Sequence, residues 1–190
     1  MVLPALFLYK MQNIVITTYP QTDAITLAEA KAHLNILDDS FDTLISDYIT
    51  AAHVFLYQET SILVDGAAKG YFKKFEDFYI PLGVVDTVAI YYYDSSETRQ
   101  TLSTDNYRLI EGKFCDVELV TEPTSLSDRE YPYEVEITTL ANDNPMVTQT
   151  LRMIVADFFE TRQTNEMGSV KEVSRSTKWM IDLISLRTSI

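Results

Sequence analysis

The segment from Ile25 to Glu59 constrains the fold more than any other part of the chain, because it predicts two consecutive helices. Thr26 and Glu29 have the spacing of a capping box, in which each side chain accepts a hydrogen bond from the backbone amide of the other residue. A first helix is therefore predicted over 26–37, where apolar residues recur at three- and four-residue steps. Its expected apolar stripe consists of Leu27, Ala30, Leu34 and Leu37.

A longer helix is predicted over 41–60, directly after an acidic turn. Either Asp39 or Ser40 can cap this helix, because an oxygen at that position accepts a hydrogen bond from a free amide of the first turn. The connection between the two helices is only a few residues long, so we expect them to be antiparallel neighbours. The apolar stripe of the second helix consists of Phe41, Leu44, Ile45, Tyr48, Ile49, Ala52, Phe55 and Leu56.

Between residues 71 and 140 apolar and polar residues alternate, which is typical of strands with one buried face. The expected strands are short and joined by tight turns, so the sheet is predicted to be mostly antiparallel. A separate β-branched run from Ile14 to Thr18 predicts a strand near the N-terminus. The strands expected in the β-region are 87–93, 99–103, 106–110, 114–120 and 133–139.

Asn144 and Pro145 predict the start of a third long helix over 145–162, because asparagine caps helices well and proline suits the first helical position. This helix is expected to pack against the 41–60 helix in the main core. After a polar connection, Ser176 is expected to cap a short final helix. The apolar residues are Val147, Leu151, Ile154, Val155, Phe158 and Phe159 in the third helix, and Trp179, Met180, Leu183, Ile184 and Leu186 in the final one.

Together these patterns predict an α+β fold, a bundle of three main helices with a small antiparallel β-sheet inserted and a short C-terminal helix. The expected organisation is an N-terminal arm over 1–21, a core over 22–163, and a C-terminal connection and docking helix over 164–190. The apolar run in the arm is too short for a membrane span or a secretory signal, so no membrane partner is expected. We expect the arm to pack on protein, such as another subunit.

The acidic residues are concentrated in the first three quarters of the chain, which has a net charge of −13. Residues 1–144 hold nine Lys and Arg against 23 Asp and Glu, whereas residues 145–190 hold six against five. An acidic body argues against a surface that grips phosphate backbones. Two interpretations remain, which are simple solubility and a surface along which DNA slides without sticking.

The sequence predicts no catalytic, cofactor or metal site. His33 and His53 lie on helices and lack a second ligand at metal spacing, so each is expected to make helix contacts. The lone Cys115 supports no intramolecular disulfide, and its alternating apolar surroundings predict a buried, inert thiol. No nucleophile motif, P-loop or dinucleotide fingerprint occurs in the sequence.

Two groups of acidic residues are interpreted as structural. The aspartates of the helical turn lack the glycine and final glutamate of a calcium loop, so a solvated turn with capping roles is expected. The glutamates of the strands are expected to form a polar face, because acid–base catalysis needs paired carboxylates in a concave pocket. These residues are Asp38, Asp39 and Asp42 in the turn, and Glu118, Glu134 and Glu136 on the strands.

The order of these features over residues 25–187 resembles the phage head–tail connector family, the head-completion adaptor proteins. The first helix pair begins with TLAEAKAHL, and the strands include PLGVVDTVAIYYYD and QTLSTDNYRL. The late helix reads LRMIVADFFETR, and the final helix reads WMIDLISLR. The apolar arm 1–21 and the stretch around Gly168 depart from the family pattern.

The resemblance implies a structural protein with no active site and no cofactor. Such adaptors form a ring, expected to contain twelve copies, beneath the portal vertex of a tailed phage. The ring extends the DNA channel and joins the next tail component. The implied partners are therefore other copies of the chain, the portal protein, a downstream tail or stopper protein, and double-stranded DNA that passes without specific binding. The implied location is the head–tail interface of the virion, after synthesis in the host cytoplasm.

The resemblance also suggests which residues meet the portal. In the family the C-terminal segment tends to reach up to the portal, so the candidate portal-side residues are Trp179, Leu183 and Leu186. The charge distribution agrees with this assignment, because a near-neutral apolar end can dock on protein while an acidic body lines a DNA passage.

Two other functions remain open from the sequence. An acidic inhibitor that mimics DNA would be a compact monomer with an evenly acidic surface, and the net charge allows it. A small hydrolase that uses acidic residues would need a deep pocket with two close carboxylates, and no sequence pattern indicates one.

Overall fold

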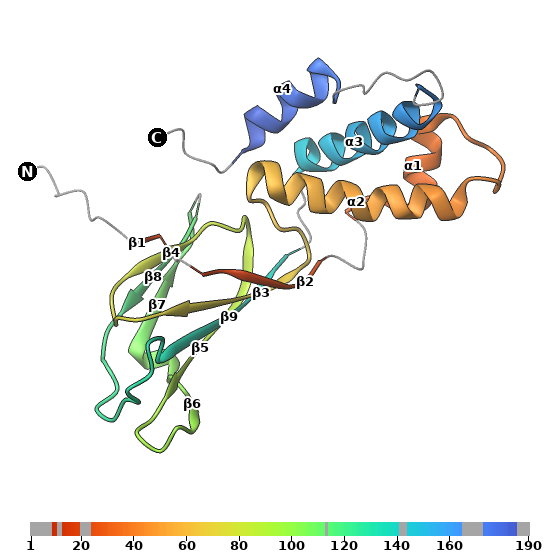
Figure 1. Ribbon diagram of the computed structural model, residues 1–190. Helices are drawn as coiled ribbons and strands as arrows, with labels where there is room; N and C mark the ends of the chain where they lie inside the picture. Colours follow the sequence, from red (N-terminus) through yellow and green to blue (C-terminus); the bar gives the residue numbers. More distant parts are fainter. Residues whose placement is uncertain are drawn as a thin grey trace, which may run out of the picture. The chain divides into compact units, whose positions relative to one another are not determined.

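The computed structural model describes residues 9–10, 13–19, 24–112, 114–140, 144–164 and 173–185 (Figure 1). Among these residues the chain forms four α-helices, a short 3-10 helix and nine strands. The chain divides into a strand unit, Met1–Thr18 with Gly66–Thr139, and a helical unit, Tyr19–Asp65 with Leu140–Ile190. No helix in the described ranges has the length and hydropathy needed to cross a membrane.

The helical unit contains α1 (Leu27–Leu34), α2 (Asp42–Thr60), α3 (Pro145–Thr164) and α4 (Arg175–Ile184). α2 and α3 are far apart in the sequence but pack side by side, and α1 and α4 each contact both of them (Figure 1). The expected packing of the third long helix against the second is therefore confirmed.

The core of the helical unit forms where the apolar stripes of α2 and α3 meet. Phe41 contacts Phe159 edge to face, with ring centroids 5.5 Å apart, and Tyr48 contacts Phe158 in the same way at 6.1 Å. Each large apolar side chain buried in this way contributes about 1.5–3 kcal/mol. The buried residues of the two stripes are Ile45, Ile49, Ala52 and Leu56 on α2, and Val147, Leu151, Ile154, Val155 and Phe159 on α3.

The helix ends show where local sequence rules hold. The capping box at the start of α1 is confirmed, because the Thr26 hydroxyl accepts from the Glu29 amide at 3.2 Å and Glu29 accepts from the Thr26 amide at 2.8 Å. α1 is shorter than predicted, since Asn35 adopts a left-handed conformation with φ of 58° and ends it. Leu37, expected in the apolar stripe, is 98% exposed as a result.

The caps predicted for two other helices are wrong. α2 begins after Phe41, which makes no side-chain capping bond, so neither Asp39 nor Ser40 has the predicted role. α4 is capped by Ser174, whose hydroxyl accepts from the Thr177 amide, two residues before the predicted cap. In contrast, Asn144 caps α3 as predicted, because its side-chain oxygen accepts from the Met146 amide at 3.0 Å.

The strand unit contains two sheets. One sheet has four strands in the order β1-β4-β8-β7, and the other has five strands in the order β2-β3-β9-β5-β6. Every pairing is antiparallel except that of β1 with β4. The strands are β1 (Tyr9–Lys10), β2 (Val15–Thr18), β3 (Ala67–Phe72), β4 (Phe78–Ile80), β5 (Val85–Tyr93), β6 (Arg99–Thr101), β7 (Tyr107–Ile110), β8 (Cys115–Leu119) and β9 (Tyr133–Thr139).

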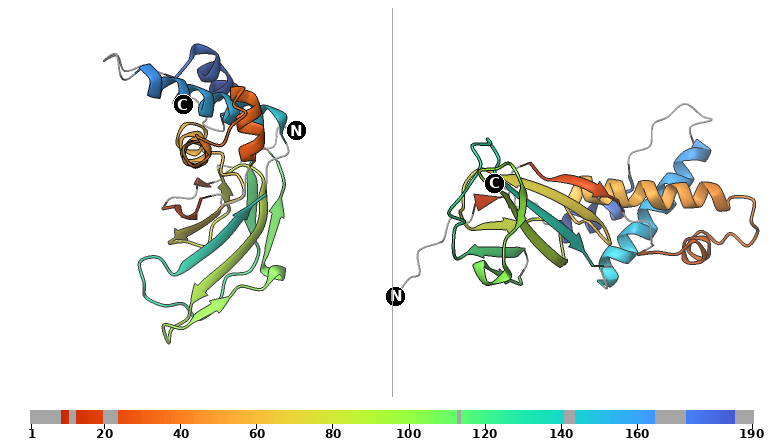
Figure 2. Two further views of the ribbon diagram at one scale, coloured as in Figure 1. Left: turned by 90° about the vertical axis from the view of Figure 1, so that its right-hand side faces the viewer. Right: turned by 90° about the horizontal axis from the view of Figure 1, so that it is seen from below.

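The two sheets pack face to face (Figure 2), and apolar side chains fill the space between them. The Tyr107 hydroxyl on β7 donates to the Val88 carbonyl on β5 at 3.0 Å, which links the sheets. The rings of Phe72 on β3 and Phe78 on β4 also meet across them, with centroids 5.0 Å apart. Strand alternation places the following residues in the shared interior: Ile80, Val88, Ile90, Val117, Tyr133, Val135 and Ile137.

The N-terminal residues supply an end strand to each sheet. β1 pairs with β4 in the four-stranded sheet, and β2, the strand predicted from the run Ile14–Thr18, pairs with β3 in the five-stranded sheet. The side chains of β2 bury little surface, so its backbone hydrogen bonds hold it in place. Part of the segment 1–21 therefore belongs to the sheets of the strand unit.

The chain is mixed α+β, but the predicted architecture is wrong. We expected three main helices, a short C-terminal helix and one small inserted antiparallel sheet, whereas the described residues form a four-helix unit and a separate unit of two sheets with four and five strands. The alternating pattern identifies strands one at a time and does not say which strands pair. Successive strands in the sequence often enter different sheets here, as β3 and β4 do, so the size of the β-region was underestimated.

Candidate interaction surfaces

Two of the three predicted portal-side residues lie on the outer face of α4. Trp179 is 61% exposed and Leu183 is 55% exposed, whereas Thr177 and Ile181 on the opposite face are buried. The two exposed residues are four apart, so they are neighbours on the helix surface. Leu186 lies outside the described residues.

The inner face of α4 explains why the outer face is exposed. Ile181 belongs to the core of the helical unit, and Ile184 packs against that core. The Ser174 amide donates to the Asp157 carboxylate of α3 at 3.0 Å, which fixes the start of α4. An apolar pair that remains exposed on a helix held in this way has the character of a protein contact surface.

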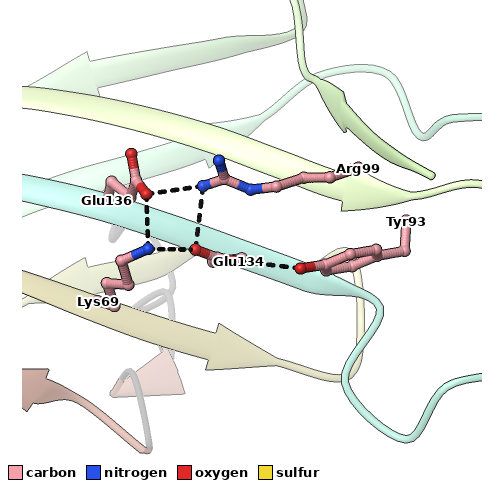
Figure 3. A network of polar contacts seen from close by, with 5 residues as sticks. All are labelled: Lys69, Tyr93, Arg99, Glu134 and Glu136. Atoms are coloured by element: carbon pink, nitrogen blue, oxygen red, sulfur yellow. Dashed lines mark hydrogen bonds and ion pairs between the residues drawn. The ribbon is translucent and has the colours of Figure 1, made fainter. Parts of the chain in front are cut away.

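A group of ion pairs lies on one face of the five-stranded sheet (Figure 3). The Glu134 side chain is almost fully buried, and one of its oxygens accepts from Lys69 and Arg99, at 3.0 Å each. Glu136 accepts from the same two cations at 2.8 Å each. The Tyr93 hydroxyl donates to the other oxygen of Glu134 at 3.2 Å.

Within this network the ion pairs favour the charged forms of Glu136 and Lys69. Hydrogen bonds from Lys69 and Arg99 hold the pKa of Glu136 below its ordinary range, with the lysine bond as the larger cause. The bonds from Glu136 and Glu134 in turn raise the pKa of Lys69. Two cations and two carboxylates neutralise each other, so the arrangement is neither an anion site nor a pair of carboxylates poised for acid–base chemistry.

The pairing partners of Glu134 and Glu136 could not be predicted from the sequence. Glu134 and Glu136 were expected to form a polar face, and they do lie on one face of β9. Their partners come from β3 and β6, and only the pairing register brings those strands beside β9 and β5. The sequence signal for this network is that Glu134 and Glu136 alternate along one strand. That signal does not show which cations they pair with.

Arginine side chains cover the tyrosines of β5. The guanidinium of Arg99 lies 3.5 Å from the ring centroid of Tyr91, and that of Arg129 lies 3.8 Å from that of Tyr93. Such contacts contribute about 0.5–1 kcal/mol at exposed sites. Tyr91 and Tyr93 therefore take part in the packing of side chains on the sheet.

The acidic turn of the helical unit is tied to one lysine. Lys31 lies 2.7 Å from the Asp39 carboxylate and 2.6 Å from that of Asp42. Asp38 accepts from the Ser40 amide at 2.9 Å, which is a local turn bond. In the part of the chain that the structure describes, no group of three or more His, Cys, Asp or Glu side chains is placed to hold a metal ion.

The three remaining residues of chemical interest are His33, His53 and Cys115. His53 is buried on α2, with Nδ1 2.8 Å from the Ile49 carbonyl oxygen, whereas His33 is exposed on α1. Cys115 is a buried free thiol, as predicted, and burial raises its pKa. A thiol of this kind has little thiolate character and is inert.

The comparison with protein families concerns the first part of this architecture. Residues 24–110, which include α1, α2 and the strands β3 to β7, match the sequence model of the phage gp6-like head-tail connector protein family. The resemblance inferred from the sequence is confirmed over these residues. No curated protein matches the sequence.

Solved structures share the fold over nearly the whole chain. A chain in the structure of the neck of an empty gene transfer agent particle, computed with C6 symmetry, superposes with a TM-score of 0.74 at 15% identity. The match covers 94% of this chain and 98% of the other. A chain of the native gene transfer agent virion gives the same values. A chain of the native particle's neck, computed with C12 symmetry, gives a TM-score of 0.63 at 14% identity, covering 93% and 97%.

Proposed function

We propose that the protein is a head–tail connector that forms a ring in the neck of a virion, below the portal. It extends the DNA channel and joins the next tail component. The observation that carries this proposal is the agreement of two comparisons. The connector family matches residues 24–110, and the fold of a neck protein from a gene transfer agent particle covers 94% of the chain.

The ring is supported by the symmetry of the related particles. The necks that contain chains of this fold were computed with sixfold and twelvefold symmetry. Cyclic assemblies of this kind use two different surfaces of each subunit, one for each neighbour. Twelve copies is the number we propose.

A structural role also fits the chemistry of the described residues. Glu134 and Glu136 each form ion pairs with both Lys69 and Arg99, so the two carboxylates serve to hold strands together. In this proposal the protein works through its contacts with other chains.

The acidic charge supports a passive DNA passage. The chain has 28 Asp and Glu against 15 Lys and Arg, so a ring of such chains repels the phosphate backbone. A passage that repels DNA lets it slide, whereas clustered lysine and arginine would hold it in place.

We assign the portal contact to the outer face of α4, with Trp179 and Leu183 at its centre and Leu186 after the helix. The support is the exposed apolar pair on a helix whose other face is fixed in the core. The C-terminal quarter of the chain is also near neutral, so it can approach another protein without strong repulsion.

A pull-down with the portal protein tests this assignment. We expect Trp179→Ala to leave the protein folded and to weaken portal binding by about 30-fold, because a central tryptophan typically contributes about 2 kcal/mol or more to an interface. Leu37→Ala is the control, since Leu37 is 98% exposed in the same unit but lies in the turn after α1. Unchanged binding of Trp179→Ala would reject the site, and failure of the unaltered protein to bind any portal would reject the function.

A further inference from the structure

β7 ends the four-stranded sheet and carries exposed apolar residues. It pairs with β8 on one side and is the last strand of the sheet in the part of the chain that the structure describes. Leu109 is 42% exposed and Ile110 is 45% exposed. Consecutive strand residues point to opposite faces, so apolar surface is exposed on both sides of this edge.

Such an edge is unusual in a protein that stays alone. End strands are normally protected by charges, prolines, bulges or a covering segment, because their free backbone groups pair with other strands. β7 carries one charged residue, Arg108, which lies opposite Glu118 of β8. The edge therefore has the features of a site for strand addition.

The N-terminal segment has the matching composition. Residues 1–8 read MVLPALFL, without a charged side chain, and they directly precede β1. An extended chain spans about 3.3–3.6 Å per residue, so eight residues reach about 26–29 Å. Pairing over four residues uses about 13 Å, which leaves about 13–16 Å to span the distance to a neighbouring copy.

The order of strands in the four-stranded sheet can place the N-terminal segment of one copy beside β7 of a neighbouring copy. β1 and β7 are the opposite ends of one sheet. In a ring each subunit contacts its two neighbours through different surfaces. If the sheet edges form those surfaces, the β1 end of one copy meets the β7 end of the next.

We propose that residues 2–8 of one copy reach the β7 edge of the next copy and pair with it over about four residues by strand addition, with their apolar side chains against Leu109 and Ile110. This inference rests on the ring proposed above and names one of its subunit contacts. Pro4 lacks an amide hydrogen, so its position faces away from β7, as prolines in edge strands do. The bond partners are backbone groups, and the apolar side chains on both faces set the register.

Crosslinking between separately purified chains tests the contact. Both chains carry Cys115→Ser, one carries Leu6→Cys, and the other carries Leu109→Cys. After mixing and ring formation, a short bismaleimide reagent is expected to give a covalent dimer of the two chains. The control partner carries Val84→Cys, since Val84 is 51% exposed in the same unit but lies outside β7.

Each outcome decides the inference. A heterodimer yield above the Val84→Cys control supports it, and a yield equal to the control overturns it. A single chain that carries both cysteines must give dimers and higher species, and a crosslink confined within one chain would mean that the arm binds its own β7. Rings of unaltered protein without the crosslink overturn only this contact, whereas the absence of rings also overturns the proposed assembly.

Removal of residues 2–8 gives an independent readout. We expect the shortened protein to keep its circular dichroism spectrum and to lose the ring, because the apolar segment that covers β7 is gone. Leu109→Lys is expected to have the same effect, and Val84→Lys is expected to leave the ring intact. Rings that persist in both the shortened protein and Leu109→Lys would contradict the inference.

Discussion

Glu134 is a carboxylate that is almost fully buried, yet the sequence around it suggests an ordinary polar strand. Its charge is tolerated because Lys69, Arg99 and Tyr93 all donate to it. These partners come from three different strands, so the network fixes the register of the sheet around β9. The capping box could be predicted because its residues are three apart, whereas the network joins Glu134 to residues 35 to 65 positions away in the sequence.

The network makes part of the stability depend on pH. The pKa of Glu136 is lowered in the folded protein by Lys69 and Arg99, so its contribution is present above the ordinary glutamate pKa of 4.5 and is lost as the pH falls through the lowered value. Glu136→Gln is expected to lower the denaturation midpoint at pH 7, and the difference from the unaltered protein is expected to shrink below about pH 4.

Urea titrations at a series of pH values check this prediction. Glu76→Gln is the control, because Glu76 forms a longer ion pair with Lys74 in which both side chains are exposed. The control is expected to change the midpoint little at any pH. A Glu136→Gln effect of the same size at pH 3 and pH 7 would show that the charge is not its cause.

At the scale of single elements, the capping box of α1 is the feature that sequence rules predict best. The Thr26 hydroxyl accepts from the Glu29 amide, and Glu29 also pairs with Arg152 of α3 at 2.8 Å. Thr26→Ala removes the first bond and is expected to lower the free energy of unfolding by about 1 kcal/mol. Thr43→Ala, which alters an exposed threonine inside α2, is the control.

Chemical denaturation of the two variants decides the matter. We expect Thr26→Ala to lower the free energy of unfolding clearly. We expect Thr43→Ala to change it by no more than about 0.5 kcal/mol, as surface substitutions usually do. Equal stabilities would mean that the capping box does not hold α1 in solution.

The errors in the helix ends have local causes. Asn35 is one of the few residues that adopt a left-handed conformation easily, so the early end of α1 carries a sequence signal that the apolar spacing concealed. The start of α2 carries no such signal. Phe41 stands at the cap position, and phenylalanine has no side-chain oxygen that could accept a hydrogen bond from the helix. For α4, Ser174 and Ser176 are both good caps, and only the packing of Ser174 against Asp157 distinguishes them.

At the scale of the whole molecule, the strands could be predicted but their pairing could not. The alternation in residues 71–140 indicates where strands lie, because each has a buried side. Which strands become neighbours depends on contacts between distant residues, such as Phe72 with Phe78 and Tyr107 with Val88 across the two sheets. The single small sheet expected from the sequence is therefore two sheets, and the role of β2 as an end strand was also missed.

The resemblance to connectors could be recognised from the sequence because it depends on the order of helices and strands more than on particular side chains. The helix pair, the strands and the late helix together resemble a connector, and the family match over 24–110 confirms that resemblance. The portal-side assignment is of another kind, because it depends on which face of α4 is exposed. Trp179 and Leu183 are exposed as that assignment requires, and their partner stays a prediction.

The central claim is that this protein acts by closing into a ring with copies of itself. Native mass spectrometry of the purified protein, alone and with the portal, combined with electron microscopy of the same sample, tests it most directly. The account predicts a closed ring, with a mass of twelve chains, that the portal binds or nucleates. A protein that stays monomeric at every concentration, both alone and with the portal, would contradict it.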